Sequence, residues 1–457
     1  MRPRPRRRRG PRPQAGRAAV ARGRRGTAGG RAVTDFKPNT LPLTGRARAD
    51  RRPHSLAEWQ ALGGYSAVEA ALKLSPAEVV AQVAAARLNG RGGAGFPAAQ
   101  KWRFMPEPGQ SPGTGPSYLI VNGDEMEPGA FKDRLLLEAL PHQVLEGAII
   151  AAHATHATEA IVLIRDAYRP GIAAMEQAIQ EARAAGLLGA LSIRVHPSAG
   201  RYIVGEETAL IEALEGNRAM PRKRPPFPAA SGLWGRPTTV NNVETISLVP
   251  HVISMGPEAF SGLSWTDEGG TKLYGVSGRV KRPQLIEAPM GTTARELIER
   301  CGGVSGNGRL LTFQPGGGAT GFLGPEHLDL PLDFGHVARA GSMFGTGTLI
   351  VLDETACPIG AVARHMRFYA RESCGWCTPC REGLPWASRI LDALEAGTAS
   401  AADLDALRMI AAEAGPRGRA FCDLMGGAMA PLASALARFG DRFEAHLTGG
   451  CPQRRLA

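Results

Sequence analysis

Apolar residues recur at helical spacing, or in short unbroken runs, along most of the chain. The clearest helix start is a serine N-cap at Ser75, followed by Pro76 in the first turn and by Glu78 as the acidic partner of a capping box. The apolar residues that follow at roughly helical spacing are Val79, Val80, Val83 and Leu88. The pattern predicts a helix that ends at Asn89 and Gly90.

Strands and helices alternate after this point. Residues 118–121 and 160–164 are short apolar runs typical of buried strands, and helical patterns begin near Pro141 and over 172–185. Such alternation predicts an α/β, Rossmann-like domain with a mostly parallel sheet covered by helices. Ligands of such sheets bind outside the carboxyl ends of the strands, where the acidic loop 122–129 is expected to lie.

The pattern changes twice toward the C-terminus. Two strands, 272–278 and 284–288, followed by a helix at 293–300, resemble the start of a β-grasp (ubiquitin-like) domain, and the chain from about Cys357 is helical and rich in alanine, as in a small bundle. The expected organisation is an Arg-rich leader (1–40), an α/β domain with a helical entry (41–262), a β-grasp domain (263–355) and a helical bundle (356–457).

A formal net charge of +12 suggests a nucleic-acid binder until the charge is located. Residues 1–31 hold twelve of the 54 basic residues and no acidic one, and the remaining 42 match the 42 acidic residues. We therefore expect no nucleic-acid partner. The leader has no apolar segment for a secretory signal and is expected to be disordered. An uninformative extension, or a start codon placed before the true start near Val33, is favoured over an RNA-binding or membrane-surface tail.

The stretch NGRGGAGFPAAQKW contains G-x-G-x-x-G at Gly90, Gly92 and Gly95. That fingerprint indicates a dinucleotide-binding fold only when a strand precedes it, and here a helix does. Pro97 is expected to block an immediate helix. The stretch is better interpreted as a glycine-rich loop whose N–H groups approach an anion, with Lys101 in reach; a flexible turn is the alternative.

Three cysteines carry the sharpest chemical signal. Cys374, Cys377 and Cys380 form two successive C-x-x-C steps, the spacing of three ligands to a cubane iron-sulfur cluster. Zinc is the main rival, although its sites usually pair two separated C-x-x-C knuckles. The seven cysteines of the chain are too few and too clustered for a disulfide framework.

The fourth ligand must come from elsewhere in the chain. Cys422 is the best placed, Cys357 and Cys451 are competitors, and Cys301 is expected to be simply buried. Because such a cluster carries one electron at a time, a phosphate-bearing cofactor beside it suggests a flavin, the usual converter between two-electron and one-electron transfer.

Several blocks, in order, now point to one family: GRGGAGFPAAQKW, VNGDEMEPGAFKDR, RYIVGEETALIEALEG, RPPFPAASGLWGRPTTVNNVET, ARESCGWCTPCREGLPW and the later Phe421-Cys422. From about Leu43 to about Leu447, the chain resembles the NADH-binding flavoprotein subunit of respiratory complex I, the 51 kDa family, known in bacteria as the F subunit of NADH-quinone oxidoreductase. The resemblance implies an NADH:quinone oxidoreductase component with one FMN, one NADH site and one [4Fe-4S] cluster.

The resemblance also implies which residues form the sites. FMN phosphate and ribityl are expected at Gly90, Gly92 and Lys101, and the isoalloxazine at Asn122, Asp124 and Glu125. The cavity is expected to be closed by Tyr202, Gly205, Glu206, Glu207, Asn241 and Asn242. NADH is expected at the backbone of Gly93, Ala94 and Gly95, at the rings of Phe96, Phe104 and Phe227 beside the adenine, and at Glu127. The cluster ligands are expected to be Cys374, Cys377, Cys380 and Cys422.

Several of these residues have plainer alternatives. The three phenylalanines would otherwise be assigned to the core, Glu206 and Glu207 suit any helix start, and Asn241 and Asn242 suit a helix cap. Asp124 and Glu125 are costly to bury without a purpose. Val204 stands where relatives commonly have cysteine, so a cysteine there is dispensable.

The implied reaction passes a hydride from NADH to the flavin N5 and then single electrons to the cluster, with no acid-base side chain and with Glu127 in a possible tuning role. The implied partners are the other complex I subunits, namely the thioredoxin-like subunit that carries a [2Fe-2S] cluster and the large iron-sulfur subunit. No run reaches 18 apolar residues, so we expect a membrane to be contacted only through partners. The resemblance implies a place on the cytoplasmic face of a bacterial inner membrane, as part of a complex.

Two other functions stay open. The diaphorase subunit of a soluble NAD-dependent formate dehydrogenase or NAD-reducing hydrogenase shares these blocks, but often carries an N-terminal thioredoxin-like domain where this chain has only a short helical entry before Gly90. A basic-tailed RNA-binding or regulatory iron-sulfur protein would need a nucleic-acid surface in the body, and residues 32–457 are charge-neutral.

Overall fold

The computed structural model describes residues 41–110, 115–306 and 308–453. All of them fall within one compact unit, Lys37–Ala457. The expected arginine-rich leader, residues 1–40, lies outside the described residues.

A four-stranded parallel sheet forms the centre of the first half, as predicted. Its strand order is β3-β2-β1-β4, and the strands are β1 (Tyr118–Gly123), β2 (Glu159–Arg165), β3 (Ser192–Ser198) and β4 (Thr238–Asn242). Strands β1 and β2 match the predicted apolar runs. Strands β3 and β4 were not predicted, because their polar side chains give no such signal.

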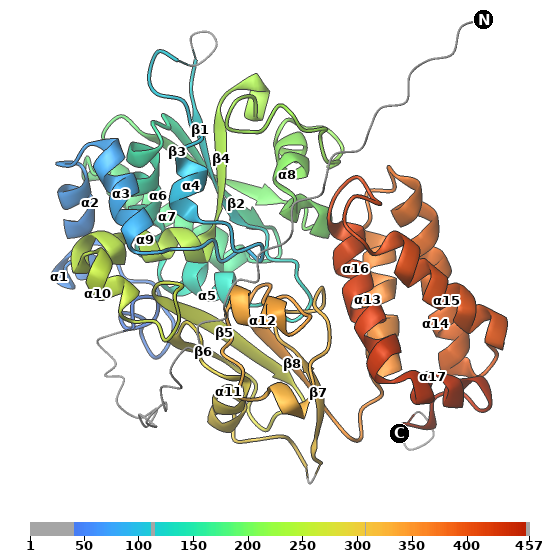
Figure 1. Ribbon diagram of the computed structural model, residues 1–457. Helices are drawn as coiled ribbons and strands as arrows, with labels where there is room; N and C mark the ends of the chain where they lie inside the picture. Colours follow the sequence, from blue (N-terminus) through green and yellow to red (C-terminus); the bar gives the residue numbers. More distant parts are fainter. Residues whose placement is uncertain (1–40, 111–114, 307, 454–457) are drawn as a thin grey trace, which may run out of the picture. The chain divides into compact units, whose positions relative to one another are not determined.

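Helices cover both faces of this sheet because successive strand side chains point to opposite sides. Leu119 and Val121 of β1 pack into the core formed with α5 (Lys132–Ala139), α6 (Pro141–Ala154), α7 (Arg169–Ala184) and α9 (Val243–Met255). Ile120 instead joins a smaller core with α8 (Glu207–Leu214). Figure 1 shows α6, α7 and α9 on one side and α8 on the other.

The helical entry packs beside this sheet. It consists of α1 (Leu56–Ala61), α2 (Ser66–Ala71), α3 (Pro76–Ala85) and α4 (Ala98–Trp102), with α10 (Pro257–Ser261) nearby. The capping box of Ser75 and Glu78 is present, as predicted. The expectation for Pro97 was wrong: α4 begins directly after it, because a proline that precedes the first turn removes no N–H that the helix needs.

The predicted β-grasp region is a second, mixed sheet of order β6-β5-β8-β7. Its elements are β5 (Thr271–Gly278), β6 (Gln284–Pro289), α11 (Ala294–Arg300), β7 (Leu310–Gln314), α12 (Phe334–Arg339) and β8 (Thr348–Asp353). The central strands β5 and β8 run parallel, and each pairs with an antiparallel edge strand. The region has its own apolar core, which includes Tyr274 and Phe313.

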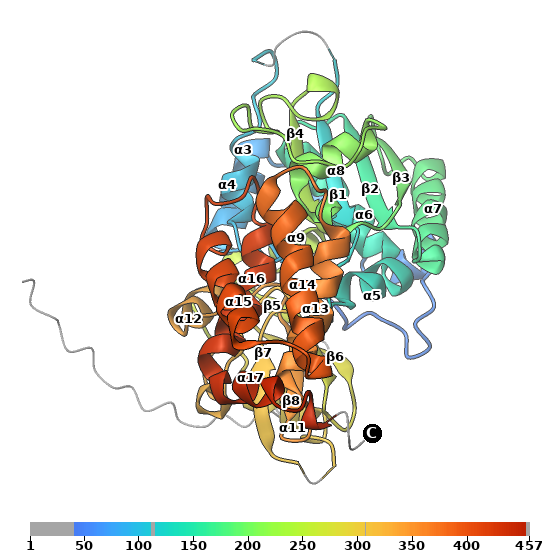
Figure 2. The ribbon, with the colours of Figure 1, turned by 90° about the vertical axis from the view of Figure 1, so that its right-hand side faces the viewer.

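The C-terminal part is the predicted helical bundle (Figure 2). It contains α13 (Pro358–Glu372), a π-helical turn (Pro379–Gly383), α14 (Leu384–Ala396), α15 (Ala401–Ala414), α16 (Leu424–Arg438) and α17 (Gly440–Leu447). Its core also includes Ile203 and Ala209, which come from the α/β region. The bundle is therefore joined to the sheet through the segment that precedes and opens α8.

No single described helix is long and apolar enough to span a membrane. Helices α5 and α6 reach the required length only as a pair, which is bent by 98°. Both contribute residues to the core of the α/β region.

Candidate cofactor site

The glycine-rich loop lies between α3 and α4 and is closed on itself. Asn89 and Pro97 pair as an antiparallel bridge, and the N–H of Gly90 donates to the carbonyl of Phe96 (2.9 Å). Gly93 and Gly95 have φ values of +125° and +68°, which side-chain-bearing residues rarely adopt. The loop thus has a defined shape, with Ala94 exposed between the two glycines.

Two of its glycines lie tightly against other parts of the protein. A Cβ on Gly95 would lie 2.5 Å from the ring of Phe334 in α12, and one on Gly92 would lie 3.3 Å from Cβ of Asn242. Backbone of the loop is therefore pressed between the end of β4 and the β-grasp region. A simple flexible turn does not describe such a packed loop.

Arg91, within the loop, points into the protein. Its guanidinium is fully buried and donates to the carbonyl of Gly269 (2.7 Å), while its N–H donates to the hydroxyl of Thr245 (2.8 Å). Burial lowers the pKa of this guanidinium. Arg91 is thus an internal anchor of the loop, and Lys101 is the cation that stays at its edge.

Lys101 extends from α4 toward the start of α8. Its Nζ lies 2.7 Å from Oε2 of Glu207, and both side chains are partly exposed. Arg224 pairs with Glu207 (3.4 Å) and with Glu206. Two cations and two carboxylates therefore line this wall of the site.

At the start of α8, Glu206 has a structural use as a helix cap. Its carboxylate accepts hydrogen bonds from the N–H groups of Thr208 (3.1 Å) and Ala209 (2.9 Å), so it is the N-cap of the helix. Gly205, just before it, is exposed, and a Cβ there would meet no described atom within 4 Å. The open space beside this backbone would allow a cofactor to approach closely.

At the end of β1, Asp124 has an incompletely bonded carboxylate. Ser198 donates to its Oδ2 (2.6 Å), whereas Oδ1 is buried with no hydrogen-bond partner among the described residues. Burial raises the pKa of Asp124 to about 6. Because an unpaired buried acceptor is costly, Oδ1 is suited to accept a donor from a bound ligand. Nearby, Asn122 accepts from the N–H of Asp124 (3.0 Å).

Glu125 has a structural use instead. Its carboxylate accepts from the N–H groups of Lys132 (2.8 Å), Asp133 (3.2 Å) and Arg134 (3.3 Å), which open α5. Burial raises its pKa. The cost of burying this carboxylate is thus offset by three donors at a helix start.

The two asparagines at the end of β4 are likewise held by the protein. Asn242 is the N-cap of α9, as the plainer interpretation expected, and its Nδ2 donates to Asp133 (2.7 Å). Asn241 is buried and accepts from the indole N–H of Trp102 in α4 (3.1 Å). Both side chains therefore connect β4 to the elements around the site.

A buried ionic network, which was not predicted from the sequence, lies beneath these residues. Lys132 lies 2.7 Å from Asp133 and 3.0 Å from Glu244, and Lys272 lies 2.7 Å from Glu244. All four side chains are almost fully buried. Burial lowers the pKa of Lys272 to about 8. Lys132 and Asp133 occur in the block AFKDR, and Glu244 occurs in VNNVET. Their presence in these blocks was the only sign in the sequence that they belong to the site.

Glu127 joins three parts of the chain. The hydroxyl of Tyr202 donates to its Oε2 (2.8 Å), and the N–H of Ala319, after β7, donates to its Oε1 (2.7 Å). A Cβ on Gly317 would lie 2.6 Å from Cγ of Glu127, so glycine makes room for the carboxylate. Burial raises the pKa of Glu127 to about 7.

The aromatic side chains expected beside the adenine are not core residues. Phe96, Phe104 and Phe227 are 43%, 57% and 57% exposed. The ring centroids of Phe96 and Phe104 lie 6.2 Å apart, and the ring planes are tilted by 39°. Phe227, also exposed, forms no ring contact with them among the described residues.

Four cysteines converge on one pocket in the bundle. Cys374, Cys377, Cys380 and Cys422 line it together with Ile203 of the turn before α8. The π-helical turn carries Cys380, which is buried at 4% exposure. Burial raises the pKa of Cys380 to about 12 and that of Cys422 to about 11, so a bound metal has to displace their protons.

The other cysteines lie away from this pocket. Cys357 is the N-cap of α13, at the opposite end of that helix from Cys374, and its thiol contacts His446 rather than the cysteines of the pocket. Cys451 lies beside Glu395 at the end of α14. Cys301 is fully buried, as expected. Of the three candidates for the fourth ligand, Cys422, Cys357 and Cys451, only Cys422 lines the pocket.

One short segment connects all of these features. It consists of the 3₁₀ turn Tyr202–Gly205 and the first residues of α8. In this segment Tyr202 donates a hydrogen bond to Glu127, Ile203 lines the cysteine pocket, and Glu207 forms an ion pair with Lys101. Val204 points into the core between β1 and α8. The glycine-rich loop and the cysteines are thus linked through this segment.

Comparison with known families agrees with this arrangement. The family described as the Nuo51 FMN-binding domain matches residues 83–251, the SLBB domain matches 273–323, and the NADH-ubiquinone oxidoreductase-F iron-sulfur binding region matches 360–446. The expected flavin and iron-sulfur regions are thereby confirmed, and the zinc interpretation of the cysteine cluster is the weaker one.

Individual relatives match over nearly the whole chain. The F subunits of the NADH-quinone oxidoreductases of Salmonella typhimurium and Escherichia coli are each 47% identical over 89% of this chain and 93% of their own length, and that of Mycobacterium bovis is 45% identical over 92% and 96%. The crystal structure of an NAD+-reducing [NiFe]-hydrogenase in the H2-reduced state is similar with a TM-score of 0.77 and 34% identity, covering 87% of this chain and 68% of that one. With this identity over nearly its full length, the chain belongs to the family of the NADH-quinone oxidoreductase F subunits.

Proposed function

We propose that this chain oxidises NADH with the help of FMN bound between the glycine-rich loop and the end of β1, and that single electrons leave through a [4Fe-4S] cluster on Cys374, Cys377, Cys380 and Cys422. As a member of the F-subunit family, it is an NADH dehydrogenase subunit that uses NADH, FMN and one such cluster. FMN, when bound, takes up electrons in pairs from NADH and releases them singly, as a one-electron cluster requires.

The observation that carries the proposal is the segment from Tyr202 to Glu207. It contacts the lysine at the edge of the glycine-rich loop through Glu207 and the cysteine pocket through Ile203. A flavin beside the loop would therefore have the cluster as its near neighbour. Electron transfer between two centres needs such proximity, and a chain that only bound nucleotides would not need the cysteines.

The residues around the loop fall into two groups, those that we assign to contact with FMN and those that position the contacting residues. We assign contact with FMN to the backbone of the loop at Gly90 and Gly92, to Lys101, to the unpaired Oδ1 of Asp124, and to the open face at Gly205. The carboxamides and carboxylates already bonded within the protein position these groups: Asn122, Glu125, Glu206, Asn241 and Asn242.

NADH is assigned to the outer side of the loop. The backbone of Gly93, Ala94 and Gly95 and the exposed rings of Phe96 and Phe104 offer a polar edge and an aromatic surface, as an adenine nucleotide requires. Phe227 is retained as a third aromatic contact because it is exposed. Glu127 faces the nucleotide in this assignment and Tyr202 orients it.

We further propose that the chain works in complex I beside the thioredoxin-like [2Fe-2S] subunit and the large iron-sulfur subunit, on the cytoplasmic face of a bacterial inner membrane. Membership of the F-subunit family supports such an assembly. The similar hydrogenase structure keeps open a soluble complex as the alternative, but its 34% identity lies below the 47% of the F subunits. The proposed domain limits are 41–262, 263–355 and 356–457.

A pull-down of the tagged chain from gently solubilised host cells tests the assembly. Recovery with a thioredoxin-like subunit, a large iron-sulfur subunit and membrane proteins is the expected result, whereas recovery with a soluble molybdenum or nickel dehydrogenase would move the chain to the alternative complex. NADH-dependent reduction of ferricyanide by the same material tests the chemistry. If a preparation that contains FMN and iron does not reduce ferricyanide with NADH, this result would contradict the proposed function.

A further inference from the structure

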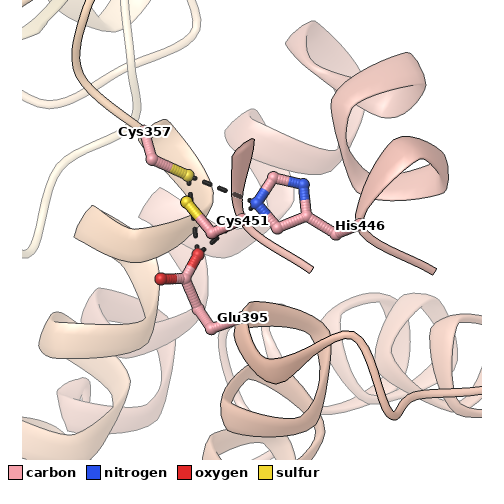
Figure 3. A group of neighbouring side chains, drawn as sticks. All are labelled: Cys357, Glu395, His446 and Cys451. Atoms are coloured by element: carbon pink, nitrogen blue, oxygen red, sulfur yellow. Dashed lines mark hydrogen bonds and ion pairs between the residues drawn. The ribbon is translucent and has the colours of Figure 1, made fainter. Parts of the chain in front are cut away.

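Four side chains far from the proposed electron path meet at the other end of the bundle. Cys357, Glu395, His446 and Cys451 each offer one ligand atom, and these four atoms all lie within 4.8 Å of one another (Figure 3). The Sγ of Cys357 lies 3.4 Å from His446 Nε2 and 3.5 Å from Glu395 Oε1, and His446 Nε2 lies 3.5 Å from Glu395 Oε1. We call this group the Cys357 cluster.

The fold brings the group together from three distant segments. Cys357 opens α13, Glu395 lies in the last turn of α14, and His446 and Cys451 lie in and after α17. Helices α13 and α14 lead into and out of the cysteine turn 374–380, so the Cys357 cluster and the iron-sulfur pocket lie at opposite ends of this helix pair. A 15-residue helix such as α13 is about 22 Å long, too far for the two groups to share a ligand.

Two glycines allow the C-terminal segment to reach α14. Gly397 ends α14 with φ +75°, and Gly450 has φ +69°. A Cβ on Gly397 would lie 2.5 Å from the backbone N of Gly450. With this close approach the N–H of Cys451 donates to the carbonyl of Glu395 (3.2 Å), which places the thiol beside the carboxylate.

Each ligand is already oriented. The Nδ1 of His446 bonds to the carbonyl of Arg442 (2.6 Å), which leaves Nε2 directed at the cluster. The Sγ of Cys357 accepts from the N–H of Gly360 (3.2 Å), and a Cβ at Gly360 would lie 3.1 Å from Oε2 of Glu395. His446 and Cys451 are buried, and the Glu395 side chain is only 10% exposed. A position oriented by neighbouring bonds and shielded from water is typical of structural metal sites.

We propose that Cys357, Glu395, His446 and Cys451 bind one Zn²⁺ ion, a structural site distinct from the iron-sulfur cluster. Two thiolates, an imidazole and a carboxylate form a donor set that suits tetrahedral zinc. With Zn–S bonds of about 2.3 Å and Zn–N or Zn–O bonds of about 2.0 Å, tetrahedral ligand atoms are roughly 3.3 to 3.8 Å apart. The spacings of 3.4 to 3.5 Å around Cys357 and His446 are already in this range.

The ion fastens the C-terminal segment to the start of the bundle. Because α13 follows β8 closely, zinc would also fix the junction between the β-grasp region and the helices that hold the iron-sulfur cluster. A hydrogen-bonded group without metal is the simpler alternative, and it predicts no stoichiometric zinc. A disulfide between Cys357 and Cys451 would leave the buried histidine and carboxylate without a shared role.

Metal analysis of the full-length chain tests the proposal. Purified chain, produced with iron and zinc in the medium and passed over a chelating resin, is expected to hold about one zinc in addition to cluster iron. The Cys357→Ser and Cys451→Ser double variant should lose at least about nine-tenths of the zinc and keep its iron. Serine at 357 retains an N-cap oxygen for α13, which favours folding. Cys301→Ser, at a buried cysteine outside both groups, is the matched control and should keep both metals.

Zinc-edge X-ray absorption of the unaltered chain serves as a second measurement that requires no variant to fold. Two sulfur neighbours at about 2.3 Å and two nitrogen or oxygen neighbours at about 2.0 Å would support the site. Four sulfur neighbours would overturn the proposal, because they would place the zinc in the iron-sulfur pocket. A chain with full iron but less than about a tenth of an equivalent of zinc, or a double variant that keeps its zinc, would overturn it as well.

Discussion

Lys101 and Glu207 are 106 positions apart in the chain, and their charged atoms lie 2.7 Å apart. The lysine stands at the edge of the glycine-rich loop and the glutamate at the start of α8, so this pair joins the two walls of the proposed flavin site. Both residues were predicted to bind the cofactor, but nothing in the sequence connected them. Their pairing means that a phosphate at Lys101 has to compete with a carboxylate.

The pair yields opposite expectations for its two members. Lys101→Ala should weaken FMN binding by about tenfold to a hundredfold, since a charge-assisted contact to phosphate is lost. Glu207→Gln removes the competing carboxylate and should leave FMN affinity equal or higher. FMN titration of deflavinated chain measures both. An equal loss in the two variants would show that the ion pair itself, rather than a lysine-phosphate contact, is what matters.

Glu127 should give nucleotide binding a pH dependence near neutrality. Burial raises its pKa to about 7, so the carboxyl is mostly neutral below pH 7 and mostly ionised above it. In the unaltered chain the affinity for NADH should change by about fivefold between pH 6 and pH 8.5, an effect of roughly 1 kcal/mol. In Glu127→Gln, which cannot ionise, this change should disappear.

Equilibrium titration with NADH across this pH range provides the measurement, and Glu258→Gln, an exposed carboxyl in α10, is the control. If Glu127→Gln keeps both the affinity and the pH dependence of the unaltered chain, Glu127 has no tuning role.

A substitution at Gly205 should affect FMN binding without affecting the stability of the fold. A Cβ at this position meets no described atom within 4 Å and the residue lacks a positive φ, so Gly205→Ala should shift the apparent Tm by less than about 2 °C. If FMN lies against this backbone, its affinity should fall by about tenfold or more. Gly440→Ala, equally open at the start of α17, is the control and should change neither quantity. Normal FMN affinity in Gly205→Ala would remove Gly205 from the site.

Cys422 should be indispensable to the iron-sulfur cluster. Cys422→Ser is expected to lose more than about half of the chain's iron, together with the electron paramagnetic resonance signal of the reduced cluster. FMN content should stay unchanged because Cys422 belongs to the bundle pocket. Cys357→Ser should keep its iron, since Cys357 lies at the other end of α13. Iron loss in Cys357→Ser alone would reverse the assignment of the fourth ligand.

Glu244 should be essential for stability. Its carboxylate contacts the ammonium groups of Lys132 (3.0 Å) and Lys272 (2.7 Å), and all three side chains are almost fully buried. Glu244→Gln would leave two buried cations undercompensated, at a cost of about 3 to 5 kcal/mol. The apparent Tm should fall by more than about 3 °C. Glu444→Gln, which breaks an exposed pair with Arg408, should leave it unchanged and serves as the reference.

Much of the fold could be predicted because its signals are local. The capping box at Ser75 and Glu78 spans one helical turn, the apolar runs of β1 and β2 are continuous, and the C-x-x-C steps bring three cysteines together regardless of the rest of the chain. Each signal depends on residues within a few positions of one another. The sequence alone therefore indicated a mostly parallel sheet, a β-grasp region, a helical bundle and a cysteine spacing that favours an iron-sulfur cluster, whereas strands β3 and β4 gave no local signal.

Tertiary contacts decided which residues of each pattern serve the site. Arg91 and Lys101 are both cations near the glycines. The guanidinium of Arg91 is buried and donates to the carbonyl of Gly269, whereas Lys101 stays at the edge of the loop and pairs with Glu207. Glu125 caps α5, while the neighbouring Asp124 keeps an unpaired oxygen. The sequence favoured Cys422 but left Cys357 as a competitor, and the folded chain places Cys422 in the cysteine pocket and Cys357 at the far end of α13. These outcomes depend on which groups meet in the folded chain, some of them more than a hundred positions apart, and the energies of desolvation and hydrogen bonding that select them exist only once the chain has packed.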